Sequence, residues 1–226
     1  MKHLLSAIAL GLLAIPPAHG EGVPRPYIEA RDYSKWENEV AAYEASDGQT
    51  PKGGILFIGS STIRLWKTLA EDFPEHKVIN RGFGGTEIVD ATHFADRLIF
   101  PHEPKQIFLR AGGNDIHAGR TPKAVARDFR DFVSVVHARL PKAEILYISV
   151  SPAPARWGES DKYRELNRLI RQMALEMPLV GFVDTYDMVL KPDGSAIPEL
   201  FVKDRLHFSP EGYKRLRERV RPFLTP

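Results

Sequence analysis

Short apolar runs alternate along the chain with longer stretches in which apolar residues recur at spacings of three and four. Runs of about five apolar residues predict buried strands, and the three-to-four spacing predicts helices packed against them. Because strands and helices alternate, we expect an α/β fold with a mainly parallel five-stranded sheet covered on both faces. The predicted strands span residues 55–58, 78–80, 106–111, 143–150 and 179–185.

Two of the predicted helices begin with recognisable residues. Thr121 precedes Pro122 and Ser209 precedes Pro210, and a hydroxyl residue followed by proline is typical of a helix start. The polar stretch 112–120 is expected to be a loop. The predicted helices span residues 33–45, 63–72, 86–98, 122–140, 161–176 and 210–221.

Length and charge limit the classes of protein to consider. The chain has 226 residues, which suits one α/β domain better than two. Lysine and arginine total 31 and acidic residues 29, so the net charge is +2. A charge this small creates no field that would attract nucleic acid, and we expect no nucleic-acid partner.

The first twenty residues differ from the rest of the chain. Lys2 and His3 precede an apolar run from Leu4 to Ile15, and small residues follow at Ala18 and Gly20, which is the layout of a secretory signal peptide. The run is shorter than the ~20 residues of a membrane span. We therefore predict cleavage of residues 1–20 and an exported protein, periplasmic or extracellular, with a single domain over residues 21–226 and no integral membrane span. An uncleaved membrane-tethering segment is the alternative, and the absence of cysteine excludes disulfides and lipid attachment at a cysteine.

A glycine and three hydroxyl residues end the first predicted strand, in "ILFIGSST" at residues 55–62. At the carboxyl end of a strand in a parallel sheet, such a turn can hold a nucleophilic serine or simply cap a helix. A nucleophilic serine needs a base that a third group orients. Asp204 and His207 offer such a pair, because a carboxylate three residues before a histidine can bond one ring nitrogen and leave the other free. For this spacing alone, a salt-bridged aspartate beside a surface histidine is the alternative.

Two further loops offer hydrogen-bond donors for an oxygen that becomes negative during acyl transfer. Glycines in "NRGFGGTE" let backbone N–H groups approach a substrate closely, and Asn114 in "AGGNDI" carries a side-chain amide. A dinucleotide site is the rival interpretation of the glycine loop, but the pattern G-x-G-x-x-G fails at Glu87. Asn114 can also bond its own backbone, as asparagine before a turn often does.

The four motifs occur in an order that resembles the SGNH hydrolases, also called the GDSL esterase/lipase family. The resemblance covers residues 55–215, and it implies a flavodoxin-like three-layer α/β/α sandwich. It also implies a serine esterase that hydrolyses carboxylic esters through an acyl-enzyme, without a metal or an organic cofactor. The residues that the resemblance assigns to catalysis are Ser61, His207 and Asp204 as the triad, with the backbone N–H groups of Ser61 and Gly85 and the amide of Asn114 as the oxyanion hole.

The chain departs from the family's first motif at Ser60, where the family usually has aspartate. The hydroxyl of Ser60 can still cap the following helix, but the charge is lost, and Ser60 becomes a rival to Ser61 as the nucleophile. A non-catalytic carbohydrate- or lipid-binding module on the same scaffold is therefore a second interpretation. A flavodoxin-like nucleotide-binding protein is a third.

The expected partner of an esterase here is a small-molecule or polysaccharide ester. Outside the predicted signal peptide, no long apolar run suggests the lid of a lipase for long-chain fats. Short acyl or acetyl esters are therefore favoured. The family resemblance also permits acetyl groups on polysaccharide, lysophospholipids and thioesters.

Three other side chains carry weaker expectations. Trp157, in a proline-broken loop after the fourth strand, is a candidate substrate contact. Trp66 is expected in the core. Arg110 ends a buried strand directly before the loop of Asn114, and it fits either a structural ion pair or recognition of an acidic substrate.

Overall fold

The computed structural model describes residues 30–50 and 52–225. The predicted signal peptide at residues 1–20 lies outside them. The chain divides into two units, Met1–Asp32 and Tyr33–Pro226, and the elements described below belong to the second.

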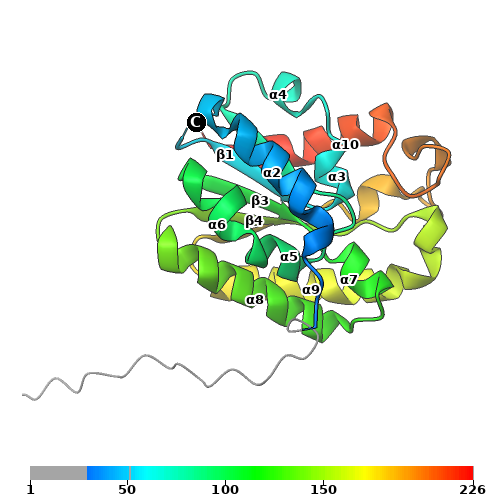
Figure 1. The fold of residues 1–226 in the computed structure, drawn as a ribbon. Helices are drawn as coiled ribbons and strands as arrows, with labels where there is room; N and C mark the ends of the chain where they lie inside the picture. Colours follow the sequence, from blue (N-terminus) through cyan, green and yellow to red (C-terminus); the bar gives the residue numbers. More distant parts are fainter. Residues whose placement is uncertain (1–29, 51, 226) are drawn as a thin grey trace, which may run out of the picture. The chain divides into compact units, whose positions relative to one another are not determined.

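Five strands form one sheet in the order β2-β1-β3-β4-β5, and each neighbouring pair is parallel (Figure 1). This confirms the predicted α/β fold. The order reverses between β1 and β3, and ligands in such sheets bind beyond the carboxyl ends of the strands at the reversal. The strands are β1 (Ile55–Gly59), β2 (Val78–Gly82), β3 (Gln106–Arg110), β4 (Glu144–Ile148) and β5 (Val180–Val183).

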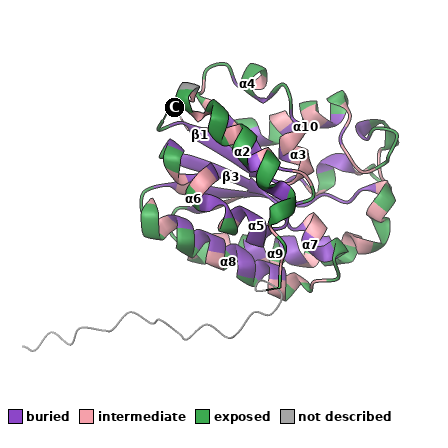
Figure 2. Ribbon diagram, viewed as in Figure 1, coloured by how far each residue is buried: buried purple, intermediate pink, exposed green. Residues whose placement is uncertain are grey.

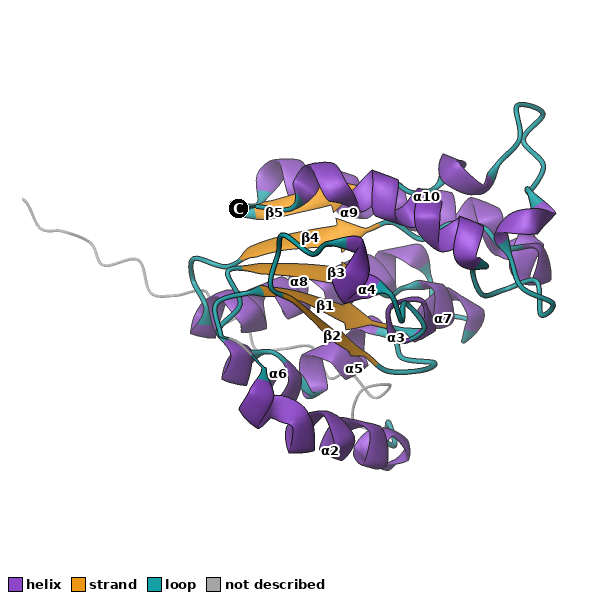
Figure 3. Cartoon of the chain, turned by 90° about the horizontal axis from the view of Figure 1, so that it is seen from above, coloured by secondary structure: helices purple, strands orange, loops and turns teal. Residues whose placement is uncertain are grey.

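Helices lie on both faces of the sheet (Figure 3). Among the helices that the structure describes, none is both long enough and apolar enough to cross a membrane. The α-helices are α2 (Glu37–Ser46), α3 (Ser61–Arg64), α4 (Leu69–Asp72), α5 (Ile88–His93), α6 (Ala95–Leu98), α7 (Gly113–His117), α8 (Pro122–Arg139), α9 (Ser160–Glu176) and α10 (Pro210–Val220). The 3₁₀ helices are η1 (Ser34–Trp36), η2 (Asp47–Gln49), η3 (Phe100–His102), η4 (Pro154–Glu159), η5 (Asp187–Val189), η6 (Pro198–Leu200) and η7 (Arg221–Phe223).

The core has two layers because successive strand residues point to opposite faces of the sheet. Leu56 and Tyr147 belong to the layer covered by α2, α5, α8 and α9. Phe57 and Phe108 belong to the layer covered by α3, α4 and α10, and their rings stack with centroids 4.6 Å apart. Trp66 joins this second layer as predicted, with 1% of its surface exposed. Figure 2 shows β1 and β3 buried throughout, whereas the outer sides of the helices are exposed.

Two helix boundaries were predicted well because the capping groups are local. The hydroxyl of Thr121 accepts a hydrogen bond from the backbone N–H of Ala124 at 3.3 Å. The hydroxyl of Ser209 likewise accepts one from Gly212 at 3.3 Å. These contacts satisfy backbone donors that have no partner inside the first turn of α8 and α10.

The helix predicted over residues 63–72 is instead two short helices, α3 and α4. The side chain of Asn80, on β2, donates a hydrogen bond to the carbonyl of Ile63 at 2.7 Å. The same carbonyl accepts from the backbone N–H of Trp66 at 3.1 Å, a three-residue step in place of the four-residue step of a continuing α-helix. The helix predicted over 86–98 is similarly divided into α5 and α6. The polar stretch predicted as a loop at 112–120 contains the short helix α7.

Candidate active site

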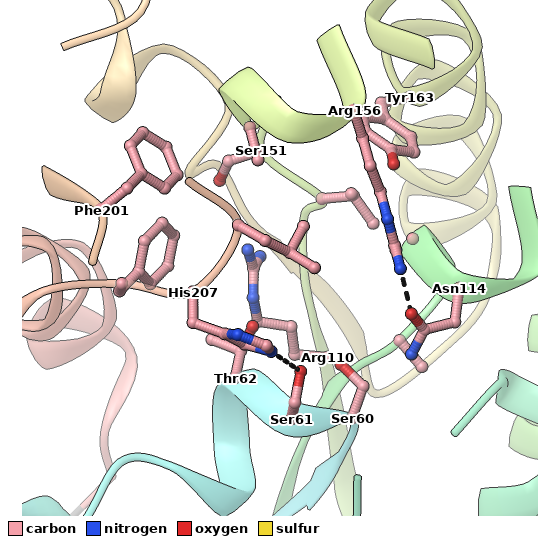
Figure 4. Close-up of a pocket in the computed structure, with 16 residues that line it drawn as sticks. Ser60, Ser61, Thr62, Arg110, Asn114, Ser151, Arg156, Tyr163, Phe201 and His207 are labelled. Atoms are coloured by element: carbon pink, nitrogen blue, oxygen red, sulfur yellow. Dashed lines mark hydrogen bonds between the residues drawn. The ribbon is translucent and has the colours of Figure 1, made fainter. Parts of the chain in front are cut away.

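The loops that follow β1 and β3 meet a loop before α10 at the carboxyl edge of the sheet and enclose a cavity (Figure 4). Ser61, Asn114 and His207 all line this cavity. Its volume is about 70 Å³, room for roughly five water molecules. The fold therefore brings three of the predicted site residues together around one small space.

The turn after β1 is shaped by a close backbone approach. Gly59 has φ 136°, and a Cβ atom at this position would lie 2.1 Å from the carbonyl oxygen of Arg110. Only glycine fits there. The chain then leaves the sheet, with the backbone N–H of Ser60 donating to the same carbonyl at 3.0 Å, and Ser61 begins α3. Ser61 is thereby held at the start of a helix, directly at the edge of the sheet.

Ser60 occupies the N-cap position of α3, but its hydroxyl makes no capping hydrogen bond. The prediction that Ser60 caps this helix through its side chain is therefore wrong. The backbone carbonyl of Ser60 instead accepts from the N–H groups of Ile63 and Arg64, at 3.0 and 3.2 Å. The backbone thus closes the turn, and the Ser60 side chain lines the cavity.

Ser61, His207 and Asp204 form a continuous hydrogen-bonded chain. The Oγ atom of Ser61 lies 2.9 Å from Nε2 of His207, as Figure 4 shows, and Nδ1 of His207 lies 2.6 Å from Oδ2 of Asp204. The other carboxylate oxygen, Oδ1, accepts from the backbone N–H groups of Leu206 and His207 at 2.9 and 3.0 Å. The loop therefore holds the carboxylate in place while the carboxylate holds the imidazole.

The charge of Asp204 fixes the direction of proton movement. The hydrogen bond from His207 and those from the backbone N–H groups of His207 and Leu206 lower the pKa of Asp204 to about 2. The carboxylate is therefore ionised at neutral pH and acts as an acceptor for a proton on Nδ1 of His207. With the proton on Nδ1, Nε2 is free to accept the proton of Ser61.

The predicted oxyanion donors are available, although Gly85 lies outside the residues that line the cavity. Among the described residues, no acceptor bonds the backbone N–H of Ser61 or Gly85. Gly85 has φ 73° and is exposed. The amide of Asn114 donates one hydrogen to the carbonyl of Thr86 at 3.0 Å, which leaves its second hydrogen for another acceptor.

Arg156, on η4, was missed by the sequence reasoning. Its Nη1 atom donates to Oδ1 of Asn114 at 3.0 Å (Figure 4). Because Thr86 and Arg156 hold opposite ends of the amide, the nitrogen of Asn114 cannot exchange places with its oxygen without losing both bonds. The only signal for Arg156 in the sequence was its position next to Trp157, the predicted substrate contact.

Trp157 does not line the cavity that contains Ser61. It is 41% exposed and lines a neighbouring hollow together with Asp161, Arg164 and Tyr186. The predicted substrate contact at Trp157 would therefore involve a part of the substrate outside the cavity that contains Ser61.

Arg110 is buried at the cavity, with 6% of its surface exposed. It donates to the carbonyl of Ser149 and to the hydroxyl of Thr185, and its guanidinium lies 5.5 Å from the centre of the Phe208 ring. Burial lowers its pKa to about 10, so it remains a cation at neutral pH. Among the described residues, no carboxylate forms an ion pair with Arg110. The structural ion pair that the sequence allowed for Arg110 is therefore absent from the described part of the chain.

A buried polar layer lies behind Asn114. Oδ1 of Asp115 accepts from the backbone N–H of Ile88 at 3.1 Å, and burial, followed by the nearby charge of Glu87, raises the pKa of Asp115 to about 7. Arg120 pairs with Asp128 at 2.6 Å. Across the described ranges, no three histidine, aspartate or glutamate side chains gather in an arrangement that would hold a metal ion.

Comparison with known proteins gives a consistent family. No curated protein matches the chain. A Streptococcus pneumoniae protein provisionally described as a platelet activating factor has a similar structure, with a TM-score of 0.77 and 23% identity over 85% of this chain and 94% of that one. A GDSL-like lipase from Bacteroides thetaiotaomicron has a TM-score of 0.65 and 20% identity over 85% and 96% of the two chains. An acetyl-xylooligosaccharide esterase from Geobacillus has a TM-score of 0.60 and 18% identity over 76% of this chain and 94% of that one.

At these identities the structures show a shared fold. The model of the GDSL-like lipase/acylhydrolase family matches residues 58–215. The chain belongs to the GDSL-like lipase/acylhydrolase family.

Proposed function

We propose that the protein is a serine esterase that hydrolyses carboxylic esters through an acyl-enzyme on Ser61. The observation that carries this proposal is the 2.9 Å contact between Oγ of Ser61 and Nε2 of His207. A serine hydroxyl is a weak nucleophile unless an oriented base removes its proton. Asp204 supplies that orientation through its 2.6 Å contact with the opposite ring nitrogen.

The reaction has two steps. In the first, Nε2 of His207 accepts the proton of Ser61 as Oγ attacks the ester carbonyl, and the imidazolium then gives that proton to the leaving alcohol. In the second, His207 takes a proton from water, hydroxide attacks the acyl-enzyme, and the proton returns to Oγ as the acid leaves. In both steps the N–H groups of Ser61 and Gly85 and the amide of Asn114 stabilise the negative oxygen.

The size of the cavity supports a short acyl group. A space of about 70 Å³ holds roughly five water-sized groups, which matches an acyl chain of a few heavy atoms. The hollow beside Trp157 lies outside this cavity, so we assign it to a larger alcohol part such as a sugar. The similarity to an acetyl-xylooligosaccharide esterase makes acetylated polysaccharide a reasonable member of the substrate class.

We also propose export of the mature chain, because residues 1–20 have the layout of a signal peptide. The N-terminal residue of the protein recovered from the producing cells tests this. Cleavage near Gly20 is expected, and a retained Met1 would contradict it.

The esterase proposal is tested by hydrolysis of p-nitrophenyl esters with acyl lengths from two to sixteen carbons, together with acetylated xylan. We expect turnover that is highest for the shortest acyl groups. Ser61→Ala should remove this turnover, whereas Ser60→Ala should retain it.

Three outcomes would contradict the proposal. Equal rates for the wild type and Ser61→Ala would indicate a binding module without turnover. Loss of activity in Ser60→Ala, with Ser61→Ala still active, would show that Ser60 and not Ser61 is the nucleophile. A preference for long acyl groups would show that the acyl chain does not bind in the small cavity.

A further inference from the structure

The catalytic cavity carries a positive charge that the proposed reaction does not use. Arg110 and Arg156 line it, and its described lining contains no aspartate or glutamate. Arg156 holds Asn114 at the rim. Arg110, in contrast, is buried to 6% exposure, and its guanidinium lies 5.5 Å from the centre of the Phe208 ring. Figure 4 shows the Arg110 side chain beside His207.

The hydrogen bonds of Arg110 leave most of its donors unused. A guanidinium has five N–H donors in a fixed fork. Both hydrogen bonds that Arg110 makes within the described chain come from Nη1, to the carbonyl of Ser149 and the hydroxyl of Thr185. Nε and Nη2 bond no acceptor within the described chain. Neither is among the fully buried polar atoms that lack a partner, so both keep some exposed surface. Because Arg110 lines the cavity, we infer that these two donors are open to it.

An arginine without a carboxylate is costly to bury. The desolvation of a buried charge is normally offset by a partner of opposite sign. The structure contains such a case, where buried Asp128 pairs with half-buried Arg120 at 2.6 Å. Arg110 has only neutral oxygen partners and the face of Phe208. A planar fork of unused donors is suited to bind a carboxylate through two hydrogen bonds.

We propose that Arg110 forms an anion subsite for the acyl part of the substrate, so that the enzyme prefers half-esters of short dicarboxylic acids such as succinate. This inference rests on the proposed esterase function. The small cavity of about 70 Å³ accepts the acyl group rather than a bulky alcohol. A carboxylate at the far end of that short acyl group then meets Nε and Nη2 of Arg110.

The test compares two esters of nearly equal shape that differ in charge, monomethyl succinate and methyl succinamate, with methanol release as the readout. A charge-assisted hydrogen-bonded pair gives a preference of about ten- to hundred-fold in kcat/KM for monomethyl succinate. This comparison needs only the wild-type protein. Equal kcat/KM values with Ser61-dependent turnover would overturn the anion subsite and leave the esterase proposal standing.

Variants then assign the preference to Arg110. Arg110→Gln should remove the preference by lowering kcat/KM for monomethyl succinate more than that for methyl succinamate, so that the ratio of the two values approaches one. Arg110→Lys should keep part of the preference because it retains the charge without the fork. Arg127→Gln, which removes an exposed arginine from α8, is the matched control and should behave as the wild type. A preference that survives in Arg110→Gln would overturn the assignment.

Two further arms separate the remaining possibilities. Acetoxyacetate and acetoxyacetamide place the charge on the alcohol part, and a preference for the charged ester only in this pair would overturn the assignment to the acyl side. If no ester is hydrolysed, the esterase proposal fails, and calorimetric titration of the same protein with succinate and with succinamide tests the subsite independently. Binding of succinate that is lost in Arg110→Gln supports the subsite, and absence of binding overturns it.

Discussion

The two sides of the proposed active site are built in different ways. The base side comes from one loop, in which Asp204 and His207 are three residues apart and backbone N–H groups hold the carboxylate. The donor side is assembled from separate segments, because Asn114 on α7 is held by Thr86 before α5 and by Arg156 on η4. A local unit keeps its geometry from its own backbone, whereas an assembled unit depends on every segment that contributes to it.

The largest effect is expected on the base side. Asp204→Asn removes the charge that fixes the imidazole, because an amide in this place can present a hydrogen instead of an acceptor to Nδ1 of His207. By comparison with other serine hydrolases, kcat should fall by roughly 10⁴. Steady-state kinetics with p-nitrophenyl acetate measures this, and a loss of less than about tenfold would show that the loop alone orients His207.

On the donor side, Asn114→Ala removes one of the three proposed oxyanion donors. We expect kcat to fall by about 10² to 10³ with little change in KM, since the developing negative charge exists only in the transition state. The same assay measures both constants. If the variant keeps most of its rate, Asn114 is not an oxyanion donor, and only the two backbone N–H groups would remain in that role.

Arg156→Gln tests whether the donor side needs its support. The variant loses the 3.0 Å bond to Oδ1 of Asn114, and a single hydrogen bond of this kind contributes about 0.5–1.5 kcal/mol, so kcat should fall up to about tenfold. In the double variant with Asn114→Ala, the effect of Arg156→Gln should disappear, because the residue it positions is gone. Additive losses would show that Arg156 acts on the substrate directly.

The smallest effect concerns stability. The pKa of Asp115 is raised from 3.8 to about 7, so between these values the folded protein binds more protons than the unfolded chain. The stability from this group is complete below about pH 4 and is lost as the pH rises through about 7. Asp115→Asn should therefore reduce the fall in Tm between pH 4 and pH 8, by about 2–4 °C for each kcal/mol removed. Thermal unfolding of both proteins at the two pH values measures this, and an unchanged fall in Tm would exclude Asp115 as its source.

Short-range patterns explain what the sequence predicted. Apolar runs located the five strands. The spacing of Asp204 and His207 alone left a surface salt bridge open, and the order of four short motifs, which resembles that of the family, selected the pair. The division of the helix at 63–72 was not predicted, and the carbonyl of Ile63 at the end of α3 bonds Asn80, 17 residues along the chain. The support of Asn114 by Arg156 joins residues 42 apart. Side-chain contacts across such separations leave no periodic signal in the chain.

The same reasoning applies to Arg110. Its position at the end of a strand was evident from the sequence, but both an ion pair and an acidic ligand fitted it. Only the fold shows that its partners among the described residues are neutral oxygens and an aromatic ring. Arg110 differs from Arg120 in its partners, because Arg120 forms an ion pair with Asp128, and the residue type alone could not show this difference.

The account depends most on the activation of Ser61 by His207. Labelling with a fluorophosphonate, followed by mass spectrometry of the digested protein, tests this directly, because such probes react with a serine whose proton an oriented base removes. We predict one adduct, on Ser61, that is absent from His207→Ala. An adduct on Ser60, or equal labelling of Ser61 with and without His207, would contradict the account.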